Sequence, residues 1–114
     1  MNKKQIGAEG ETAACKYLVK AGYRIIERNH RDSAGEIDVI ARKDDVIVFV
    51  EVKTRNGSGY GYAAECVGAV QRRRYVASAK KYLAAHNMCS KDARFDVIEV
   101  QDGRINHIID AFRS

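Results

Sequence analysis

The sequence lacks the features that would assign it at once to several structural classes. Its 114 residues include no proline and no tryptophan, and no apolar run is long enough to cross a bilayer. There is no internal repeat, low-complexity tract or linker, so we expect one domain over residues 1–114. The first residues run into glycine and glutamate instead of an apolar signal core, which predicts a cytoplasmic protein without a membrane partner.

Cysteine and histidine are scarce and show no metal-binding spacing. The three cysteines are far apart and form no C-x-x-C pair, which excludes a zinc-ribbon pattern and a disulfide framework: Cys15, Cys66 and Cys89. We expect them to be small, half-buried thiols. The three histidines are equally scattered, and none has a second ligand at the spacing of a metal site.

The residues that are present have the balance of an ordinary folded protein, with 46% hydrophobic and 31% charged side chains. Lysine and arginine number 20 against 15 aspartates and glutamates, which gives a formal net charge of +5. This sign favours polyanionic partners, but the excess is modest and many proteins that bind no nucleic acid share it. Charge alone therefore does not assign a function.

The spacing of apolar residues predicts two helices and five strands. In chain order they are a helix at 3–21, strands at 23–28, 35–42 and 46–54, a helix at 67–86, and strands at 94–100 and 104–112. Gly22 is well placed to end the first helix, and turns at 44–45 and 101–103 join neighbouring strands. The strand 46–54 begins with an apolar run on both faces, as expected at the centre of a sheet. The order predicts an α/β fold with a mixed central sheet flanked by helices.

Acidic residues gather at the ends of two strands that should be neighbours. Successive strand side chains alternate faces, so Glu51 and Lys53 point the same way. Glu36 and Asp38 likewise share a face of the preceding strand, and a hairpin would bring Asp38 beside Glu51. Carboxylates that converge repel one another, and a divalent cation is the natural compensation. Oxygen ligands without histidine or cysteine favour Mg²⁺ or Mn²⁺ over Zn²⁺.

A third acid comes from the first helix. By helical angle Glu11 lies at the edge of the apolar stripe and can reach the same centre, whereas Glu9 faces solvent. These acidic residues also have simpler structural interpretations. Glu51 and Lys53 could form only an edge salt bridge, and the two acids of the preceding strand could be solvated on an edge strand.

The pattern of Asp38 followed by Glu51-x-Lys53 after a hydrophobic strand resembles the PD-(D/E)xK nuclease superfamily, which has a restriction-endonuclease-like fold. A closer resemblance is to the YraN-type family of uncharacterised bacterial proteins, and it runs over almost the whole chain. The motifs that carry it are Gly10-Glu11, 35–41, 48–55 and Arg94-Phe95-Asp96. The resemblance further implies kinship with archaeal Holliday-junction resolvases, which use an early helical glutamate; Glu11 is the matching position.

This resemblance implies a metal-dependent DNA endonuclease that hydrolyses phosphodiester bonds. Asp38 and Glu51 would hold Mg²⁺ or Mn²⁺, with the carbonyl oxygen of Val52 as a further ligand. Lys53 would orient or help to deprotonate the attacking water and stabilise charge on the phosphate. Glu11 would assist at the metal or through its bound water. Glu36 is the alternative acid if the strand register differs by one step of the pleat.

Further residues are candidates for contact with nucleic acid. Gln71 and Tyr75 fit the Q-x-x-x-Y pattern of RecB-like nucleases and would share one helix face, although Tyr75 is also explained as a core residue. The predicted DNA-contacting side chains are Arg55, Gln71, Arg73, Arg74 and Lys80. The glycine-rich segment 56–61 lacks the G-K-[ST] ending of a P-loop. We expect a mobile loop at the mouth of the site, with Tyr60 and Tyr62 able to stack on unpaired bases.

Branched or single-stranded DNA is the expected partner, and a resolvase-like role would suit a homodimer. Two alternatives belong to other functional classes. A non-catalytic nucleic-acid-binding module of the same fold would bind DNA without metal-dependent turnover. A small interaction protein would use the acids only to stabilise its sheet.

Overall fold

A computed structural model describes residues 3–55 and 68–113, and its elements follow the predicted order. They are α1 (Lys3–Lys20), β1 (Arg24–Asp32), β2 (Gly35–Lys43), β3 (Val46–Arg55), α2 (Ala69–Ala85), β4 (Asp92–Gln101) and β5 (Arg104–Phe112). The predicted loop 56–61, with Tyr60 and Tyr62, lies outside the described residues. No helix within the described ranges is long and apolar enough to cross a membrane.

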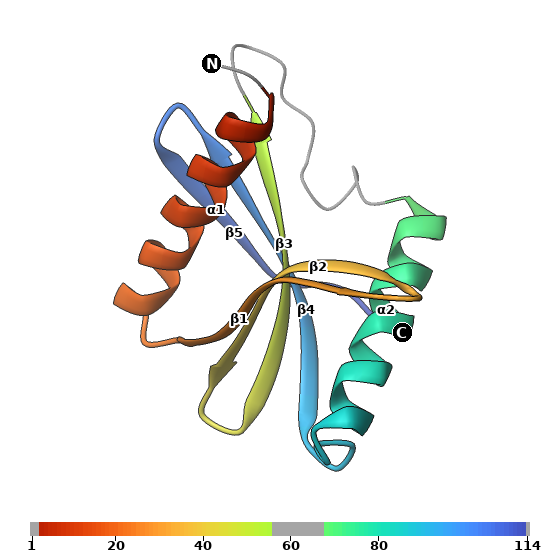
Figure 1. The fold of residues 1–114 in the computed structure, drawn as a ribbon. Helices are drawn as coiled ribbons and strands as arrows, with labels where there is room; N and C mark the ends of the chain where they lie inside the picture. Colours follow the sequence, from red (N-terminus) through yellow and green to blue (C-terminus); the bar gives the residue numbers. More distant parts are fainter. Residues whose placement is uncertain (1–2, 56–67, 114) are drawn as a thin grey trace.

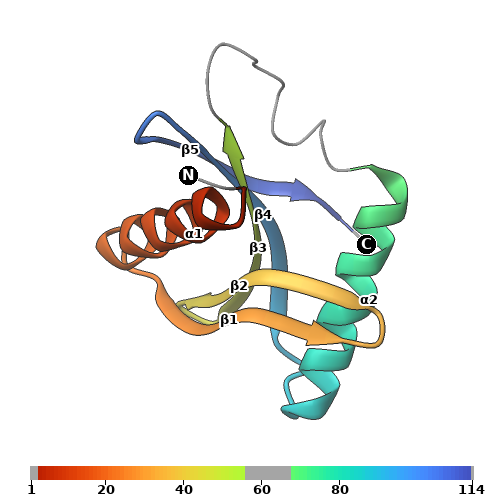
Figure 2. The ribbon, with the colours of Figure 1, turned by 45° about the horizontal axis from the view of Figure 1, so that its top comes forward.

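The strands form one mixed sheet in the order β1-β2-β3-β4-β5. Neighbouring strands are antiparallel except for β3 and β4, which are parallel. Figure 1 shows α1 on one face of the sheet and α2 on the other, and the turned view in Figure 2 shows the same layers. This confirms the predicted α/β class, and the architecture is consistent with a restriction-endonuclease-like fold.

The central strand β3 is covered on both faces, as its apolar run predicts. Ile47 and Phe49 pack in the core beneath α2, while Val48 and Val50 pack in the core beneath α1. All four side chains are fully buried. Because side chains alternate along a strand, Glu51 and Lys53 continue the α2-facing row.

Two glycines determine how α1 sits on the sheet. Gly22 ends the helix with a positive φ of 94°, and the Tyr23 N–H donates to the Leu18 carbonyl at 2.9 Å, which is a Schellman-type cap. At Gly10 an added Cβ would lie 2.0 Å from the Thr54 hydroxyl oxygen. The absence of a side chain at Gly10 therefore lets α1 approach the end of β3 and places the next residue, Glu11, near that end.

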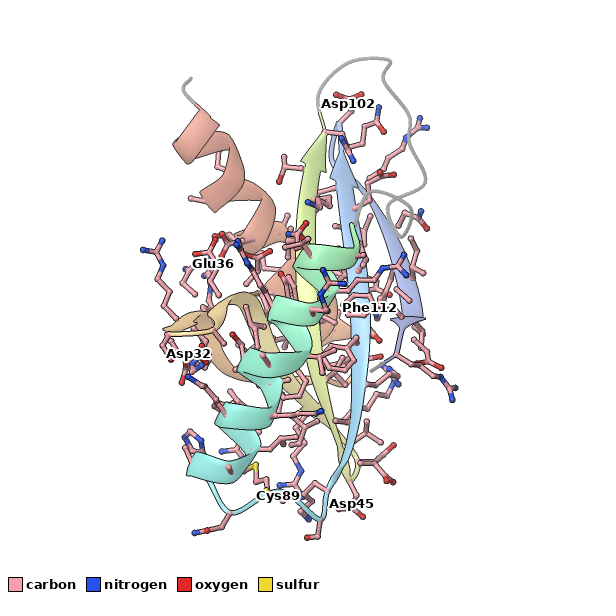
Figure 3. All side chains as sticks on the ribbon, turned by 90° about the vertical axis from the view of Figure 1, so that its right-hand side faces the viewer. Asp32, Glu36, Asp45, Cys89, Asp102 and Phe112 are labelled. Atoms are coloured by element: carbon pink, nitrogen blue, oxygen red, sulfur yellow. The ribbon has the colours of Figure 1, made fainter. Side chains whose placement is uncertain are left out.

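Strands β2 and β3 separate after the pair Val39–Val50. The outer half of β2 then pairs only with β1, whereas β3 continues along β4. We call this separation the fork. Strand β1 extends to Asp32, beyond the predicted end at residue 28, because its polar outer half pairs with β2 even though it lacks apolar alternation. Figure 3 shows the hairpin tip against the flank of α2, where the Ser78 hydroxyl donates to Asp32 Oδ1 at 3.0 Å.

The expectation of half-buried thiols is wrong for both cysteines that the structure describes. Cys15 is buried on the side of α1 that faces the sheet, and burial raises the pKa of its thiol. Cys89 is exposed in the turn that follows α2. The third cysteine, Cys66, lies outside the described residues.

Candidate active site

Asp38 lies at the fork, where β2 leaves β3. Its Oδ2 accepts a hydrogen bond from the Val52 N–H at 2.8 Å. In a continued antiparallel ladder, a backbone carbonyl of β2 would receive bonds of this kind. The Asp38 carboxylate thus compensates for the backbone partner that β3 loses at the fork. The Tyr75 hydroxyl of α2 also donates to Asp38 Oδ2, at 3.5 Å.

Glu51 directly follows Val50, the last residue of β3 that pairs with β2, and it is only 3% exposed. Its Oε1 accepts from Gln71 Nε2 at 2.6 Å and lies 2.9 Å from Lys53 Nζ. Its Oε2 is buried and has no hydrogen-bond partner among the described residues. A buried carboxylate oxygen without a partner is rare and unfavourable, so Glu51 is prepared to receive a cation or a further donor.

Glu11 reaches the same region from α1, on the other face of the sheet. Its Oε1 is likewise buried without a hydrogen-bond partner in the described part of the chain. Burial raises the pKa of Glu11, and the charge of Glu36 adds to this, whereas Arg28 and Asn29 act in the opposite direction. Glu11 therefore lies where a negative charge is poorly compensated.

The neighbouring acidic side chains affect the pKa of Asp38. Burial raises the pKa of Asp38 to about 6, against the lowering effect of the Val52 hydrogen bond. The negative charges of Glu11, Glu51 and Glu36 raise it further. Like charges that are brought together in this way favour either protonation or a bound cation.

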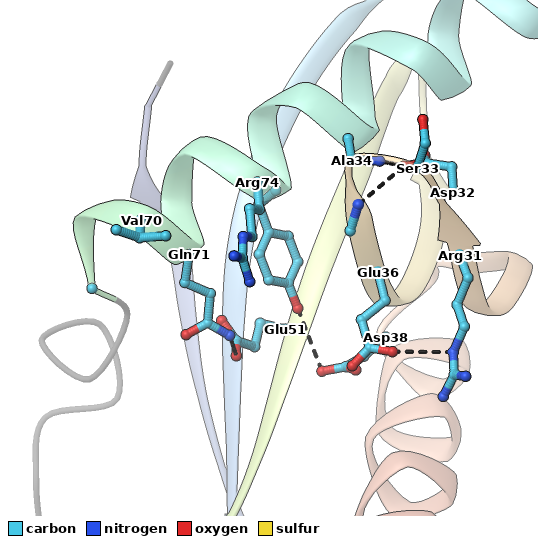
Figure 4. A pocket seen from close by; sticks show the side chains of 13 residues that line it. Arg31, Asp32, Ser33, Ala34, Glu36, Asp38, Glu51, Val70, Gln71 and Arg74 are labelled. Atoms are coloured by element: carbon cyan, nitrogen blue, oxygen red, sulfur yellow. Dashed lines mark hydrogen bonds and ion pairs between the residues drawn. The ribbon is translucent and has the colours of Figure 1, made fainter.

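An open cleft of about 910 Å³ gives access to these acids. It lies between the β1–β2 hairpin tip and the first turns of α2, and Figure 4 shows Asp38, Glu51 and Gln71 facing into it. Its charged lining residues within the described ranges are Arg31, Asp32, Glu36, Asp38, Glu51 and Arg74. Four carboxylates against two guanidinium groups make the lining acidic, although the protein as a whole is basic.

Comparison with known proteins identifies the family. A model of the uncharacterised protein family UPF0102 matches residues 10–100. The chain belongs to this family. A UPF0102 protein of Clostridioides difficile is 44% identical over 114 residues, which cover 98% of this chain and 100% of that relative. UPF0102 proteins of Persephonella marina and Symbiobacterium thermophilum are 42% and 48% identical, over 93% and 88% of this chain and 91% and 85% of theirs.

This confirms the predicted YraN-type family, and the UPF0102 match covers all the residues that meet at the fork. In the structure Glu51 and Lys53 form an ion pair at 2.9 Å, and the charges of Glu11 and Glu51 both raise the pKa of Asp38. The Val52 N–H points to Asp38, and because the N–H and C=O of one strand residue point to the same edge, its carbonyl is directed toward the fork. Glu36 lines the same cleft, but its side chain is 62% exposed and pairs with Arg31 at 3.1 Å.

The predicted DNA-contacting residues are placed in different surroundings. Gln71 is bonded to Glu51, and Arg74 lines the cleft. Arg73 and Lys80 are exposed on α2. Arg55 lies 3.7 Å from Glu99 on the neighbouring strand β4, so its charge is already opposed by a carboxylate.

Two residues near the site of this UPF0102 chain make contacts that the sequence did not predict. Tyr75 is a core residue, as expected, but its hydroxyl also reaches Asp38, and the Q-x-x-x-Y spacing was the signal for this contact. Arg31 lines the cleft opposite α2. Its position could be found only from the register of the hairpin, which pairs Arg31 with Glu36.

Proposed function

We propose that this protein is a divalent-metal-dependent hydrolase of phosphodiester bonds in DNA, a member of the PD-(D/E)xK nuclease superfamily. One observation carries the proposal. Asp38 and Glu51 lie at the fork and line an open cleft, Lys53 lies 2.9 Å from Glu51, and Glu51 keeps a buried oxygen without a hydrogen-bond partner among the described residues. An exposed edge salt bridge or solvated edge acids would not leave Glu51 only 3% exposed.

The residues at the fork suit a hard divalent cation. No group of three or more His, Cys, Asp or Glu side chains is arranged to hold a metal ion in the described part of the chain. Mg²⁺, however, is usually bound by one or two carboxylates, while water and substrate phosphate complete its coordination. Such a partial set of ligands could come from Asp38, Glu51 and the Val52 carbonyl. The buried Oε2 of Glu51, which has no hydrogen-bond partner among the described residues, would be one of the oxygens that bind the cation.

When bound, Mg²⁺ or Mn²⁺ would supply Lewis-acid stabilisation of the phosphate and lower the pKa of a coordinated water. Lys53 Nζ would donate a hydrogen bond to the attacking water or to the phosphate oxygen on which charge develops. Gln71 holds Glu51, and Tyr75 holds Asp38, so both α2 residues would orient the acids. Glu11 would accept a proton or a hydrogen bond from a water on the α1 side.

The expected substrate is branched, flapped or single-stranded DNA in the cytoplasm, as the resemblance to junction resolvases implies, and a homodimer would suit such a substrate. Arg74 in the cleft and the exposed residues Arg73 and Lys80 would contact phosphates, together with Arg55. Binding that relies on such contacts should weaken steeply with salt.

A non-catalytic nucleic-acid-binding module is the second candidate, and a specific observation favours it. Asp38 Oδ2 already accepts from two donors, and Glu51 Oε1 is likewise occupied by Gln71 and Lys53. Acids whose only role is to stabilise the fork would also make such contacts with neighbouring donors. The module predicts salt-sensitive DNA binding that survives Asp38→Asn and Glu51→Gln, without metal-dependent turnover.

The decisive experiment is a Mg²⁺-dependent cleavage assay on branched, flapped and single-stranded DNA. Lys53→Ala should lower the cleavage rate at least about 100-fold, the typical effect of removing one transition-state donor. Lys91→Ala removes an exposed lysine in the turn before β4 and is the matched control, which should cleave at the wild-type rate. Equal rates for the wild type and Lys53→Ala on every substrate would refute the catalytic assignment.

A further inference from the structure

Two guanidinium groups stand on opposite walls of the acidic cleft. Arg31 comes from β1, near the hairpin tip, and Arg74 comes from the second turn of α2. Both are exposed, and both line the cleft that leads to Asp38 and Glu51 (Figure 4). The acids thus lie at the inner side of the cleft, and the two positive charges flank its entrance.

The position of Arg74 depends on the hairpin tip. An added Cβ at Gly35 would lie 3.3 Å from the Arg74 Cβ, so the tip packs directly against the base of this side chain. The guanidinium group itself has no ion-pair or hydrogen-bond partner among the described residues. Arg74 is therefore held at its base, while its charged end is available to a ligand.

Arg31, in contrast, forms an exposed ion pair with Glu36. Its Nε lies 3.1 Å from Glu36 Oε2 across the β1–β2 pair, and both side chains are mostly exposed, at 78% and 62%. Exposed ion pairs of this kind contribute little to stability, because water solvates both partners well. A phosphate group can therefore replace Glu36 as the partner of Arg31.

The chemistry of the cleft determines what these two residues can bind. A polynucleotide strand carries a phosphate at each nucleotide, so a strand whose scissile phosphate lies at the acids places its neighbouring phosphates near the entrance. Arginine matches phosphate with a planar pair of donors. The acidic lining would repel the same phosphates unless these guanidinium groups contact them.

We propose that Arg31 and Arg74 form a phosphate clamp for the backbone on either side of the scissile phosphate, and that Glu36 holds Arg31 until the strand enters. This inference rests on the proposed function and specifies its substrate contact. It also assigns Glu36 a role at the rim of the cleft in place of the alternative metal-binding acid.

The test measures binding of a fluorescein-labelled DNA oligonucleotide by anisotropy, with Ca²⁺ in place of Mg²⁺ and over a range of salt concentrations. Arg31→Ala and Arg74→Ala should each weaken binding about 5- to 10-fold. Each should also reduce the slope of log Kd against log salt by about 0.7 to 0.9, which corresponds to one lost phosphate contact. Arg31→Lys should restore the slope but only part of the affinity.

Arg24→Ala is the matched control, because Arg24 is an exposed arginine at the opposite end of the same strand. It makes the same change in net charge and should alter neither the affinity nor the slope. If Arg31→Ala behaves like Arg24→Ala while the wild type binds and cleaves DNA, the clamp is wrong and the proposed function stands. If the wild type binds no DNA at all, both are wrong.

Glu36→Gln tests the second half of the inference. It should tighten DNA binding about threefold, because it frees Arg31 and removes one negative charge from the rim. The gain should shrink in the Arg31→Ala background, which a double-mutant cycle measures. Loss of cleavage with unchanged binding would instead assign Glu36 to the metal-binding acids and overturn its rim role.

Discussion

Two aspartates, the half-buried Asp38 on β2 and the fully buried Asp96 on β4, lie in the same sheet and have opposite surroundings. Asp96 is fully buried, and Arg94 donates to both of its oxygens at 2.8 and 2.9 Å. His107 Nε2 and the Asp110 N–H complete its contacts at 2.7 and 3.0 Å. Asp38 has one good donor, the Val52 N–H, and a long contact from Tyr75.

The pKa values of the two carboxyls express this difference. Burial alone would raise the pKa of Asp96, but the bonds from His107, Arg94 and Asp110 hold it below its ordinary value. Burial raises the pKa of Asp38 to about 6, and the neighbouring acids add to the increase. The chain itself completes the surroundings of the Asp96 anion. At Asp38 no described cationic side chain lowers the pKa, so a proton or an added cation would balance the anion.

The hydrogen bonds around Asp96 form a network that also connects separate elements of the fold. The Tyr17 hydroxyl lies 2.9 Å from His107 Nδ1, so the network joins α1 to β4 and β5. Arg94 donates in addition to the Tyr23 hydroxyl at 2.8 Å. The network thus combines a pair within β4, Arg94 and Asp96, with partners from other parts of the chain. A satisfied polar network of this kind stabilises one arrangement of a core.

The largest effect that separates the two aspartates is expected for Asp96→Asn. The substitution keeps the shape of the side chain but leaves Arg94 and His107 without their anion. We expect a loss of about 3 kcal/mol or more in the free energy of unfolding, as for other broken buried ion pairs. Urea denaturation measures it. A loss below about 1 kcal/mol would mean that Asp96 is no more than an ordinary hydrogen-bond acceptor.

The same substitution at Asp38 should act in the opposite direction. A pKa raised from 3.8 to about 6 means that the folded state disfavours the anion by up to about 3 kcal/mol at neutral pH. The amide oxygen introduced by Asp38→Asn would still accept the Val52 N–H, but without a charge. We therefore expect Asp38→Asn to be about 1–2 kcal/mol more stable than the wild type when both are unfolded by urea in EDTA. A destabilised variant would show that the fork needs the carboxylate for its own stability.

This gain should depend on pH. Between pH 4 and 6 the native state holds a proton on Asp38 that the unfolded state has released, so the contribution of Asp38 to stability falls as the pH rises. The stability difference between Asp38→Asn and the wild type should therefore be small near pH 4 and reach its full size above pH 7. Urea titrations at several pH values measure this difference, and a difference independent of pH would contradict the raised pKa.

The last prediction concerns α1, the helix that contacts both regions. Gly10→Ala places a Cβ against Thr54 and should destabilise the protein by about 1–2 kcal/mol, because α1 must move away from β3. Gly7→Ala is the matched control, since its Cβ meets no atom within 4 Å. It should stabilise the helix by about 0.5–1 kcal/mol. Thermal melts of both variants test the close approach, and equal shifts would refute it.

Local patterns in the sequence predict much of the fold. The alternation in β2 and β3, together with the short turn at residues 44–45, is sufficient to bring Asp38 close to Glu51. Gly22 ends α1 as its position indicates. These features depend on neighbours along the chain, and for such features the period of apolar residues is informative.

The remaining features depend on contacts between distant segments. The fork arises because β3 continues along β4 while the hairpin turns toward α2, and no spacing in β2 indicates this. The same holds for the outer half of β1, whose polar residues give no strand signal. The contact between Tyr75 and Asp38 joins positions 37 residues apart, so the sequence indicated it only through a short motif.

The most direct test of the account is a crystal structure of the protein soaked in Mn²⁺. We predict an anomalous peak between Asp38 and Glu51, with Glu51 Oε2 among the ligands, and no such peak in crystals of Asp38→Asn. An empty fork in which Asp38 and Glu51 keep only their contacts to Val52, Tyr75, Gln71 and Lys53 would contradict the metal-dependent mechanism.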